Sequence, residues 1–474
     1  MKRNKKISNA KTLSVIGLGR LGAPLAACFA AKGFQVIGVD RNPAVVSLMN
    51  TGKAPVYEPG LDELIRKNKK RIRAVSDIQE AVLNSQATFI VVATPSNESG
   101  ASSLEYVLPV CKDIAEALRQ KSEFHLVVLT STVMPGAMQN EVLKVLEAHS
   151  GKKCGKDFGL CYNPEFIALG SVIHDFLNPD LLLIGESDSN SGSLLEALYK
   201  GVHENRPKVA RMNWINAELV KLSLNTFITT KITFSNTLAR ICEKLPKADV
   251  DIVSSALGLD SRIGPKYLKG AIGYGGPCFP RDTVAFSQMA KSLGISARLA
   301  EATDETNREQ VLLLKELIKL KLAPGGTVGI LGLSYKPDTN VAEASQGLLL
   351  AQVLVQDGIE VVAYDPLAVD NAKLVLNGSV CFSDSPKQCI TASDVIAIIT
   401  PWKIFQELRP QWFKRAESKR VLIDCWRFLD PAKYQPVTEY IALGLGPDEF
   451  RTNLEYMVID GANANGSFKF PKFR

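Results

Sequence analysis

The stretch that decides the fold lies near the start of the chain, where the β-branched run Thr12–Ile16 leads into the glycine-rich turn Gly17-Leu-Gly-Arg-Leu-Gly22. A helix is expected to open at once over residues 23–32. The first glycine allows a tight turn, the second lets a pyrophosphate approach the backbone, and the third permits close packing of helix on strand. Free N–H groups at the helix start would face the phosphates. The residues predicted to form this turn are Gly17, Leu18, Gly19, Arg20, Leu21 and Gly22.

An acidic residue after the second expected strand indicates which dinucleotide binds. The run Phe34–Val39 ends in Asp40, 18 residues beyond Gly22, where a carboxylate can accept hydrogen bonds from the adenosine ribose. Asp40 would repel a 2′-phosphate, so the pattern favours NAD over NADP, although Arg41 beside it could soften that preference. The alternative, a structural turn followed by a chance aspartate, is disfavoured by the strand–turn–helix context.

The alternation of short apolar runs with helical patterns continues to about residue 212 and predicts a parallel sheet flanked by helices. The expected strands and helices are Thr12–Ile16, Phe34–Val39, Thr88–Ala93, Leu126–Leu129 and Leu181–Ile184, and Ala23–Lys32, Leu61–Asn68 and Leu104–Gln120. Ligands of such sheets bind at the carboxyl ends of the strands. Thr94, Pro95, Ser131 and Thr132 follow two of these strands and are predicted to border the cofactor, unless they form simple strand-ending turns.

A long helical pattern follows the sheet. From Asn216 to Glu243 apolar residues recur at helical spacing over 28 residues, which suits a connector between domains or a subunit interface. Lys221 and Asn225 are four residues apart and share one face of this helix. They are either two donors aimed at a developing oxyanion or a snorkelling lysine beside a solvated asparagine.

The segment Gly273-Tyr-Gly-Gly-Pro-Cys278-Phe-Pro-Arg281-Asp282 fits neither helix nor strand. Asp282 lies four residues past the Cys278 thiol, one turn away if a helix starts there. A reactive cysteine needs positive or hydrogen-bonding surroundings, which Arg281 or a remote lysine could supply. In isolation a buried inert cysteine is the favoured interpretation. Next to a dinucleotide domain, Cys278 instead suggests oxidation of an aldehyde through a thioester.

Strand–helix alternation resumes after a linker at Ala323–Gly326, with expected strands Thr327–Leu331, Val361–Tyr364, Val395–Ile399 and Val421–Ile423. The predicted fold class is therefore α/β, with two Rossmann-like doubly wound parallel-sheet domains joined by a central α-helical domain that holds the long helix. The predicted divisions are a basic tail at 1–11, an NAD-binding domain at 12–212, a helical dimerisation domain at 213–322, a nucleotide-sugar domain at 323–460 and a tail at 461–474.

Composition and charge exclude several functional classes. The 474 residues carry a net charge of +7, but the excess basic residues lie in the two tails and leave the body nearly neutral, which argues against a nucleic-acid partner. No apolar stretch is long enough to span a membrane, and no apolar segment typical of a signal peptide follows the basic start. Nine scattered cysteines indicate a reducing cytoplasm, and four dispersed histidines predict no metal site.

Together these pieces resemble the UDP-glucose/GDP-mannose dehydrogenase family over nearly the whole chain. The most specific match is the Gly-Gly-x-Cys-Phe-Pro-x-Asp segment that contains Cys278. The remaining motifs, in family order, are Gly17–Gly22 with Asp40, Glu58-Pro-Gly-Leu61, Thr94-Pro95 with Leu104–Val107, Ser131–Gly136, Asn163-Pro-Glu-Phe166, Lys221 with Asn225, Arg262, Gly332-Leu-Ser-Tyr335-Lys336-Pro337 and Tyr364-Asp365-Pro366.

The resemblance implies oxidation of C6 of a nucleotide-linked hexose to a carboxylate in two steps, with two NAD+. Cys278 would trap the C6 aldehyde as a thiohemiacetal, and a second hydride transfer would give a thioester. Lys221 and Asn225 would hold the C6 oxygen. Asp282 with Thr132 would position water and accept the proton, and Glu165 would assist hydrolysis.

The resemblance also implies where the substrate lies, which is between the two α/β domains. Arg262, reaching across a dimer, and Lys336 would meet the nucleotide phosphates and sugar, while the Lys269–Gly275 backbone would form a wall. The full set of implied substrate contacts is Glu165, Phe166, Ile167, Lys221, Asn225, Arg262, Tyr267, Gly273, Tyr274, Gly275, Tyr335, Lys336 and Arg427.

Several positions depart from the family pattern. Pro277 stands where serine is commoner and Arg281 where lysine is commoner, and neither is expected to change the reaction class. Leu169 stands where an acid is usual and Glu343 where arginine is usual, near the cofactor in both cases. We hypothesise a coupled change, because removing both charges of an ion pair costs far less than removing one. The segment Asp424-Cys-Trp-Arg427 replaces Asp-Gly-Arg, which leaves the Arg427 contact uncertain by one position.

Three functions remain in competition at this point. The preferred one is oxidation of UDP-glucose, and the alternative is oxidation of a UDP-N-acetylhexosamine or of GDP-mannose. A non-catalytic nucleotide-sugar or NAD-binding protein is supported only by Leu169 and Glu343. The long helix favours a homodimer or a higher homo-oligomer.

Overall fold

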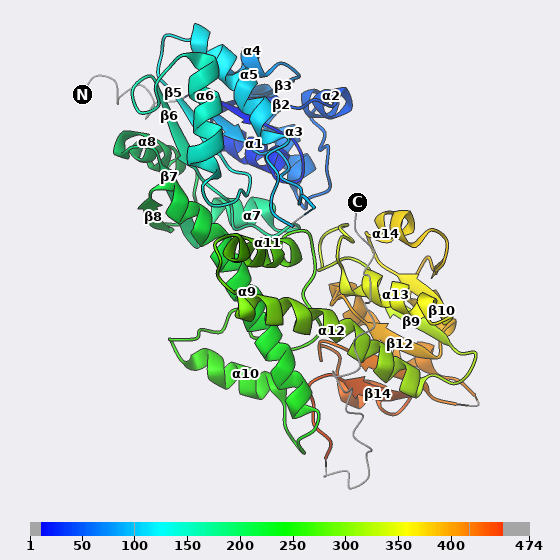
Figure 1. Cartoon of the computed structure of the whole chain (residues 1–474). Helices are drawn as coiled ribbons and strands as arrows, with labels where there is room; N and C mark the ends of the chain where they lie inside the picture. The colour runs from blue at the N-terminus through cyan, green and yellow to red at the C-terminus, as the bar shows by residue number, and fades with distance from the viewer. Residues whose placement is uncertain (1–10, 99, 417, 449–474) are drawn as a thin grey trace.

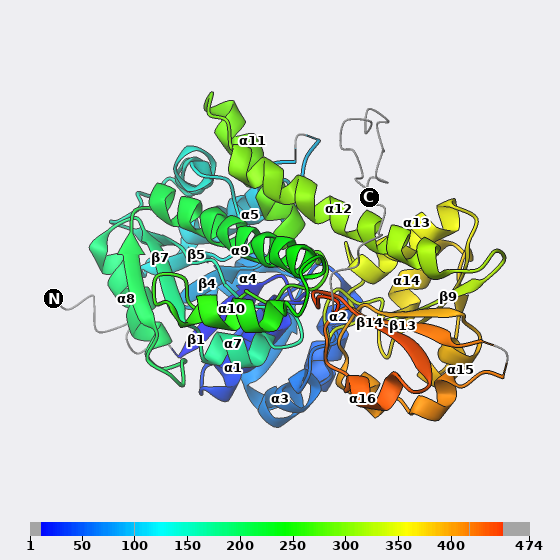
Figure 2. The same cartoon turned by 90° about the horizontal axis from the view of Figure 1, so that it is seen from below.

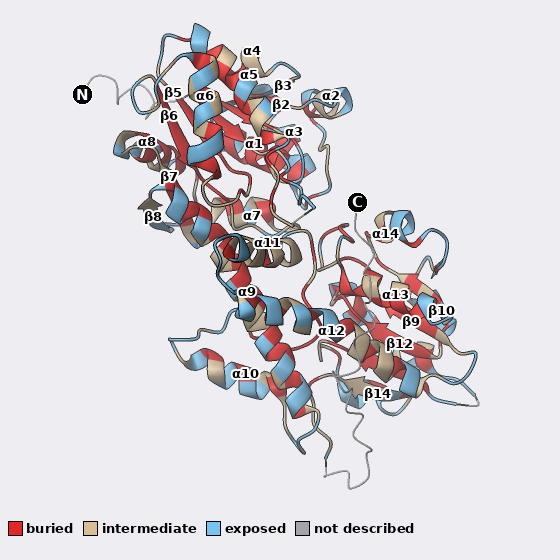
Figure 3. Ribbon diagram, viewed as in Figure 1, coloured by how far each residue is buried: buried red, intermediate tan, exposed pale blue. Residues whose placement is uncertain are grey.

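The computed structural model describes residues 11–98, 100–416 and 418–448, and the two predicted tails lie outside them except for Lys11. Two α/β units are joined by a group of helices, as predicted (Figure 1). Most residues of the central strands of both units are buried, whereas the edge strands are more exposed, and the other exposed residues lie mainly on the surrounding helices and loops (Figure 3).

The first unit holds an eight-stranded sheet in the order β3-β2-β1-β4-β5-β6-β7-β8. Its strands are β1 Thr12–Ile16, β2 Gln35–Val39, β3 Ile72–Val75, β4 Ala87–Ile90, β5 His125–Leu129, β6 Phe158–Tyr162, β7 Leu181–Glu186 and β8 Lys208–Met212. The predicted parallel pairing holds for all neighbours except β6 and β7, which are antiparallel. The connection at 163–180 therefore begins and ends at the same edge of the sheet, the carboxyl edge of β6.

Helices cover both faces of this sheet and enclose two apolar cores. They are α1 Gly22–Ala31, α2 Pro43–Thr51, α3 Leu61–Asn68, α4 Ile78–Leu83, α5 Val107–Gln120, α6 Leu143–Ser150, α7 Val172–Leu177 and α8 Ser189–Tyr199, with a 3₁₀ turn at Lys69–Arg71 and a π turn at Met138–Val142. Phe29 of α1 packs against Phe89 and Tyr199, so aromatic rings join α1, the sheet and α8.

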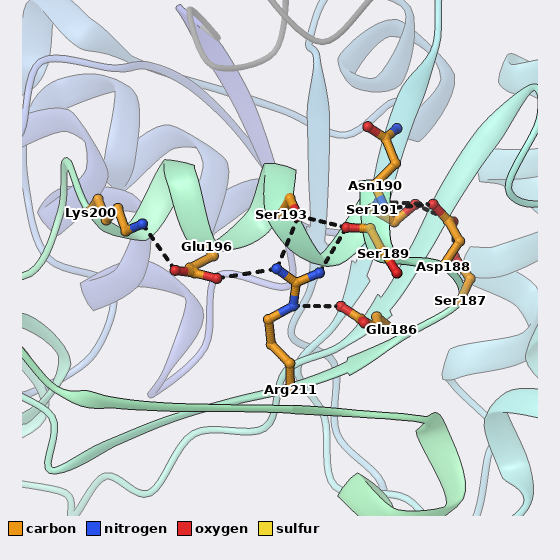
Figure 4. A network of polar contacts seen from close by, with 10 residues as sticks. All are labelled: Glu186, Ser187, Asp188, Ser189, Asn190, Ser191, Ser193, Glu196, Lys200 and Arg211. Atoms are coloured by element: carbon orange, nitrogen blue, oxygen red, sulfur yellow. Dashed lines mark hydrogen bonds and ion pairs between the residues drawn. The ribbon is translucent and has the colours of Figure 1, made fainter.

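An ion-pair network anchors the edge strand β8 (Figure 4). Arg211 on β8 pairs with Glu186 at the end of β7 and with Glu196 on α8. Asp188 caps the start of α8 by accepting from two backbone amides. Since α9 begins two residues after β8, this anchored strand fixes the point from which the long helix leaves the sheet.

The central helices are α9 Trp214–Cys242, α10 Val250–Leu259, α11 Phe279–Ser292 and α12 Arg298–Lys321. The predicted long helix, Asn216–Glu243, is α9, and its boundaries differ by one or two residues. Its buried face is unusually polar, with Glu218, Lys221 and Asn225 all nearly inaccessible to solvent. In the view from below, α12 runs from this group to the second unit, where it packs beside α13 (Figure 2).

The second unit is a six-stranded, fully parallel sheet in the order β11-β10-β9-β12-β13-β14. Its elements are β9 Thr327–Leu331, α13 Gln346–Gln356, β10 Glu360–Tyr364, α14 Val369–Leu376, β11 Cys381–Phe382, α15 Pro386–Thr391, β12 Val395–Ile398, 3₁₀ turns Lys403–Glu407 and Pro410–Phe413, β13 Arg420–Asp424, α16 Pro431–Tyr434 and β14 Thr438–Ala442.

The same kind of turn follows the first strand of each unit, and in each it is held by an aspartate that follows the next strand of that sheet. In the first, Asp40 after β2 accepts a 2.9 Å hydrogen bond from the Leu18 amide, and in the second, Asp365 after β10 accepts a 2.8 Å bond from the Leu333 amide. The second turn, however, is followed by a long loop at 335–344 before its helix begins. That loop reaches the first unit, where a Cβ on Gly170 would lie 2.5 Å from the Asp338 carbonyl oxygen. The loop therefore brings the second unit against the carboxyl edge of the first.

Candidate active site

The glycine turn after β1 has room for a phosphate. A Cβ on Gly19 would meet no atom within 4 Å, whereas a Cβ on Gly22 would lie 1.7 Å from the Gly17 carbonyl oxygen. Helix α1 also begins without a side-chain cap at Leu21. The free space above Gly19 and the uncapped N–H groups of α1 fit the pyrophosphate of a dinucleotide.

The predicted cofactor residues meet at the carboxyl ends of β1, β2, β4 and β5. The carboxylate of Asp40 is held by the backbone amides of Leu18 and Asn42, each at 2.9 Å, which places it beside the glycine turn. Ser131 donates a 2.5 Å hydrogen bond from its hydroxyl to the Val92 carbonyl, so the Ser131–Thr132 and Thr94–Pro95 turns are joined. The Arg41 guanidinium lies 5.2 Å from the centre of the Tyr106 ring.

Cys278 stands directly before α11, as the spacing to Asp282 predicted. The Asp282 amide donates a 2.8 Å hydrogen bond to the Cys278 carbonyl, which is the first bond of that helix. Cys278 is exposed to solvent, so it is not the buried cysteine of the alternative interpretation, and its reactivity stays a prediction. Dense packing around it raises the pKa of the thiol, while the charges of Arg281 and Lys221 favour the thiolate.

Asp282 is fully buried beneath the cysteine, and both of its carboxylate oxygens are engaged. Asn225 donates from Nδ2 to Oδ2 at 2.6 Å, and Arg281 donates from Nε and Nη2 to Oδ1 at 2.9 and 2.8 Å. Because Asn225 is buried and bonded to this carboxylate, the alternative of a solvated asparagine is wrong. Asp282 is thus a buried anion held by one cation and one amide.

Lys221 lies one turn before Asn225 on α9 and is buried as well. Its Nζ donates a 2.7 Å hydrogen bond to the backbone carbonyl of Glu165 and lies 4.8 Å from the centre of the Phe166 ring. Burial lowers the pKa of Lys221, and the nearby charges of Asp282 and Cys278 oppose this. The amine is therefore a short-range donor inside the protein rather than a snorkelling surface lysine.

Glu165 lies on the connection between β6 and β7, at the carboxyl edge of the sheet. Burial raises the pKa of its carboxyl to about 7, although Lys221 and a hydrogen bond from Tyr199 lower it. The Tyr199 hydroxyl also donates a 2.5 Å bond to the Asn163 side chain, which orients it. Near neutral pH this carboxyl can exist both as an acid and as a base, as a group that exchanges protons with water must.

The segment before Cys278 packs tightly against the second unit. A Cβ on Gly275 would lie 2.2 Å from the Ala344 carbonyl oxygen, and one on Gly276 would lie 2.5 Å from the Tyr335 ring. Next to Tyr335, burial lowers the pKa of Lys336, and the carboxylates of Asp175 and Glu58 from the first unit oppose that shift. This cation is therefore held at the boundary between the two units.

Four predicted substrate residues lie at the margin of this cluster or outside it. The Arg262 side chain is 87% exposed and pairs with Asp260 at the end of α10. The three guanidinium nitrogens of Arg427 are all engaged in bonds within the protein. Tyr267 is half exposed and has its ring 6.3 Å from that of Phe279, and Ile167 packs against the first core.

The two departures, Leu169 and Glu343, both lie around Arg20 of the glycine turn. Glu343 Oε2 is 3.9 Å from Arg20 Nη1. Leu169 and Arg20 line one cavity of about 260 Å³ together with Tyr57 and Asn340. The second unit therefore presents an anion to a cation of the turn, and the hypothesis of a coupled change stays a prediction.

Two buried glutamates shape the site and were not predicted from the sequence to have a role in it. Glu58 accepts 2.8 Å hydrogen bonds from the Gly170 and Val172 amides and holds the end of the loop that begins near Glu165. Glu218 accepts from the Gly136 and Met138 amides, and fixes the turn after Thr132. For Glu218 the available signal was an acid three residues before Lys221 on the same face of the predicted long helix. Glu58 lies in a loop before α3, and its only signal was its place in the Glu58-Pro-Gly-Leu61 motif.

Within residues 11–98, 100–416 and 418–448, no group of His, Cys, Asp or Glu side chains is arranged to hold a metal ion. In the same part of the chain, no helix has the length and apolar character needed to cross a membrane.

Comparison with known proteins matches the chain to three consecutive domains of one family. The matches are to the NAD binding domain of the UDP-glucose/GDP-mannose dehydrogenase family over residues 11–203, its central domain over 215–309 and its UDP binding domain over 329–431. The first of these agrees with the free space above Gly19, and the third with the position of Lys336.

Individual relatives cover most of the chain. It is 34% identical over 416 residues to UDP-glucose 6-dehydrogenase of Haloferax volcanii, covering 87% of this chain and 96% of the relative. It is 36% identical over 358 residues to GDP-mannose 6-dehydrogenase of Pseudomonas putida, covering 74% and 80%. The solved structure of a UDP-glucose dehydrogenase from the hyperthermophilic archaeon Pyrobaculum islandicum superposes with a TM-score of 0.81 at 34% identity, covering 92% and 98%. This chain therefore belongs to the UDP-glucose/GDP-mannose dehydrogenase family, whose members oxidise nucleotide sugars with NAD.

Proposed function

We propose that this chain is a UDP-glucose 6-dehydrogenase that converts UDP-glucose to UDP-glucuronate. The observation that carries the proposal is the position of an accessible cysteine above a buried anion, beside a buried lysine and a carboxyl of raised pKa. Relatives named as UDP-glucose 6-dehydrogenases, among them the one from Bacillus subtilis, support the choice of sugar.

In the first oxidation the C6 hydroxyl of the hexose loses a proton and the C6 carbon loses a hydride. NAD bound at the glycine turn supplies the hydride acceptor in both oxidations. The donors of Lys221 and Asn225 hold the C6 oxygen, so that negative charge on this oxygen is stabilised as it develops. Asp282, with a water positioned by Thr132, accepts the proton. Arg281 and Asn225 hold the carboxylate of Asp282 in a fixed orientation.

In the second oxidation the Cys278 sulfur adds to the C6 aldehyde and forms a thiohemiacetal. Loss of a second hydride from C6 leaves a thioester on Cys278. Water then attacks the thioester carbonyl, Glu165 accepts a proton from that water, and the C–S bond breaks to restore the thiol. In total the alcohol, two NAD+ and one water give the carboxylate, two NADH and three protons.

The tightly packed Gly273–Gly276 segment supports a substrate position between the two units. Lys336 at that boundary would meet the substrate phosphates. We also propose that Arg262 reaches a substrate bound to a second copy of the chain, because its side chain is far more exposed than those of the other predicted substrate-binding residues. All nine cysteines are unpaired, which supports a cytoplasmic protein.

The decisive experiment measures NADH formed per sugar consumed, with purified protein, NAD+ and a panel of UDP- and GDP-hexoses. Two NADH per UDP-glucose are expected. Two with GDP-mannose, the substrate named for the Pseudomonas putida relative, or with a UDP-N-acetylhexosamine would keep the chemistry and change the substrate. One or none across the panel would overturn the proposal.

A variant at the cysteine tests the thioester. Cys278→Ser is expected to bind UDP-glucose and to yield no uronate. The serine hydroxyl is a weaker nucleophile toward the aldehyde than the thiol, and the oxygen ester that it would form hydrolyses more slowly than a thioester. Cys381→Ser, at the other exposed cysteine, is the matched control and should behave like the unmodified protein. Full uronate production by Cys278→Ser would contradict the mechanism.

A further inference from the structure

The segment from Gly270 to Tyr274, which leads to Cys278, is buried without belonging to a helix or strand. Ala271, Ile272 and Tyr274 are nearly inaccessible to solvent. Buried backbone N–H and C=O groups must find partners, and in irregular segments these partners are usually side chains. The partners here are unusual, because they come from several different helices.

Two asparagine side chains each bind the segment through both of their amide atoms. Asn236 of α9 accepts from the Ala271 N–H at 2.9 Å and donates to the Ile272 carbonyl at 2.9 Å. Asn307 of α12 accepts from the Tyr274 N–H at 2.7 Å and donates to the Tyr274 carbonyl at 3.1 Å. Each asparagine thus reproduces the pair of bonds that a neighbouring strand would supply.

The second α/β unit contributes two more bonds to the same segment. Gln346, the first residue of α13, donates from Nε2 to the Tyr274 carbonyl at 3.0 Å. Arg427 donates from Nη2 to the Gly270 carbonyl at 2.6 Å and pairs with Asp251 of α10. The Tyr274 carbonyl is therefore shared by Asn307 and Gln346, from the helical group and from the second unit.

The chain has little freedom between this point and the thiol. Only Gly275, Gly276 and Pro277 separate Tyr274 from Cys278, and both glycines lie against the loop of the second unit. Beyond the thiol, α11 starts at once and its Thr283 hydroxyl lies 3.1 Å from that of Thr229 on α9. A displacement of Tyr274 is consequently passed on to Cys278 instead of being absorbed.

We propose that Asn307 is a positioning residue for the reaction. It fixes the backbone of Tyr274 and thereby holds the Cys278 thiol next to Lys221 and Asp282, and Gln346 couples that position to the second unit. The proposal rests on the proposed function, because it assigns Cys278 the role of nucleophile. Asn307 itself is nearly inaccessible to solvent and acts through the backbone it holds.

The test compares Asn307→Ala with a matched variant, Asn50→Ala. Asn50 of α2 makes the same pair of bonds with Ala74 of β3 in the first unit, to the Ala74 N–H at 2.8 Å and to the Ala74 carbonyl at 2.9 Å. Each variant loses one two-bond contact. Because Asn50 is exposed and Asn307 is buried, Asn307→Ala should lower the melting temperature more than Asn50→Ala. A purely structural role for Asn307 predicts a loss of stability without a change in the kinetics of the folded protein.

We expect Asn307→Ala to lower kcat by roughly tenfold or more, since small displacements of reacting groups are costly. Its KM for NAD+ should stay within about twofold of the unmodified value, because the glycine turn lies in another unit. Asn50→Ala should keep kcat. Gln346→Ala removes one bond and should lower kcat less than Asn307→Ala does. It replaces Asn307→Ala in the test if that variant does not fold. Equal kcat in all four proteins would overturn the proposal.

A second readout does not depend on the sugar. Iodoacetamide alkylation of Cys278, followed by peptide mass mapping over a range of pH, reports how well the thiolate is stabilised. In Asn307→Ala the midpoint should move to higher pH, because the thiol leaves the cations of Arg281 and Lys221. An unchanged or lower midpoint would overturn the positioning role. If the unmodified protein oxidises no sugar, this result still decides on Asn307 while the proposed function fails separately.

Discussion

Glu165 and Lys221 show how burial prepares two side chains for opposite tasks. Desolvation disfavours the charged form of each, so the pKa of the carboxyl rises to about 7 while that of the amine falls. Lys221 donates to the Glu165 backbone carbonyl and leaves the carboxyl free of a direct ion pair. The carboxyl is therefore close to half ionised at neutral pH, which suits proton exchange with water.

The raised pKa of Glu165 predicts the pH dependence of thioester hydrolysis. Only the ionised carboxylate can accept a proton from water, so the hydrolysis rate should rise with pH through about 7 and level off above it. Glu165→Gln should lose this rise, slow hydrolysis about a hundredfold or more, and accumulate the thioester. Single-turnover kinetics over pH 5.5–9 with denaturing mass spectrometry would measure both.

The control for this experiment is Glu218→Gln. Glu218 is also buried and burial also raises the pKa of its carboxyl, but it accepts only backbone bonds in the turn after Thr132. It should retain the rise with pH. If Glu165→Gln retains the rise as well, the assignment of the base to Glu165 is wrong.

At the residue scale, spacing predicted neighbours along one element but not contacts between elements. The position of Asp282 one turn after Cys278, and the shared face of Lys221 and Asn225, follow from helical geometry and appear in the structure. The bond from Asn225 to Asp282 joins α9 to α11, and no local pattern encodes it. The same holds for Asn307, an ordinary polar residue of a helix until the fold places it beside Tyr274.

At the scale of the element, two glycines of the turn between β1 and α1 have different roles, one in folding and the other in ligand binding. Gly22 must be glycine for the helix to pack on the turn, because a Cβ there would overlap the Gly17 carbonyl. Gly19 has free space around it, which suits the close approach of a pyrophosphate to the backbone. Two single substitutions can therefore distinguish the two roles.

Gly22→Ala should lower the free energy of unfolding by about 1–3 kcal/mol, the usual cost of overpacking. Gly19→Ala should leave the melting temperature within about 2 °C of the unmodified value and weaken NAD+ binding roughly tenfold or more, since its methyl group occupies the ligand's space. Thermal denaturation without ligand and calorimetric titration with NAD+ measure the two effects. A destabilised Gly19→Ala protein that still binds NAD+ normally would contradict this division.

The accuracy of the predicted elements depended on how clearly their ends were marked. Thr12–Ile16, Leu61–Asn68 and Thr327–Leu331 match the structure because glycines or charged residues bound them sharply. The strand β6 was missed, since its five residues include a glycine and a cysteine and show no alternation. The predicted strand Leu181–Ile184 begins where its antiparallel partner β7 begins and ends two residues short of it, but the direction of pairing is a tertiary property.

At the scale of the whole molecule, the exposed side of α9 has a composition that suits another protein surface. Its large exposed apolar residues are Ile215, Leu219, Phe227, Phe234 and Ile241. The last three recur every seven residues and therefore lie along one stripe of the helix. Apolar stripes of this length are seldom left in water, and they mark interfaces between proteins. We expect this stripe to pair with the same stripe of a second copy.

The pairing is tested by charging the stripe. Phe227→Glu combined with Phe234→Glu should convert a dimer into a monomer in sedimentation equilibrium, because two carboxylates would meet their symmetry mates in an isologous interface. Leu374→Glu, at an exposed leucine of α14 in the second unit, is the control and should remain dimeric. If Arg262 serves the site of the partner copy, the monomer should also lose affinity for UDP-glucose while NAD+ binding is retained. A charged-stripe variant with the mass and sugar affinity of the unmodified protein would show that α9 is not the interface.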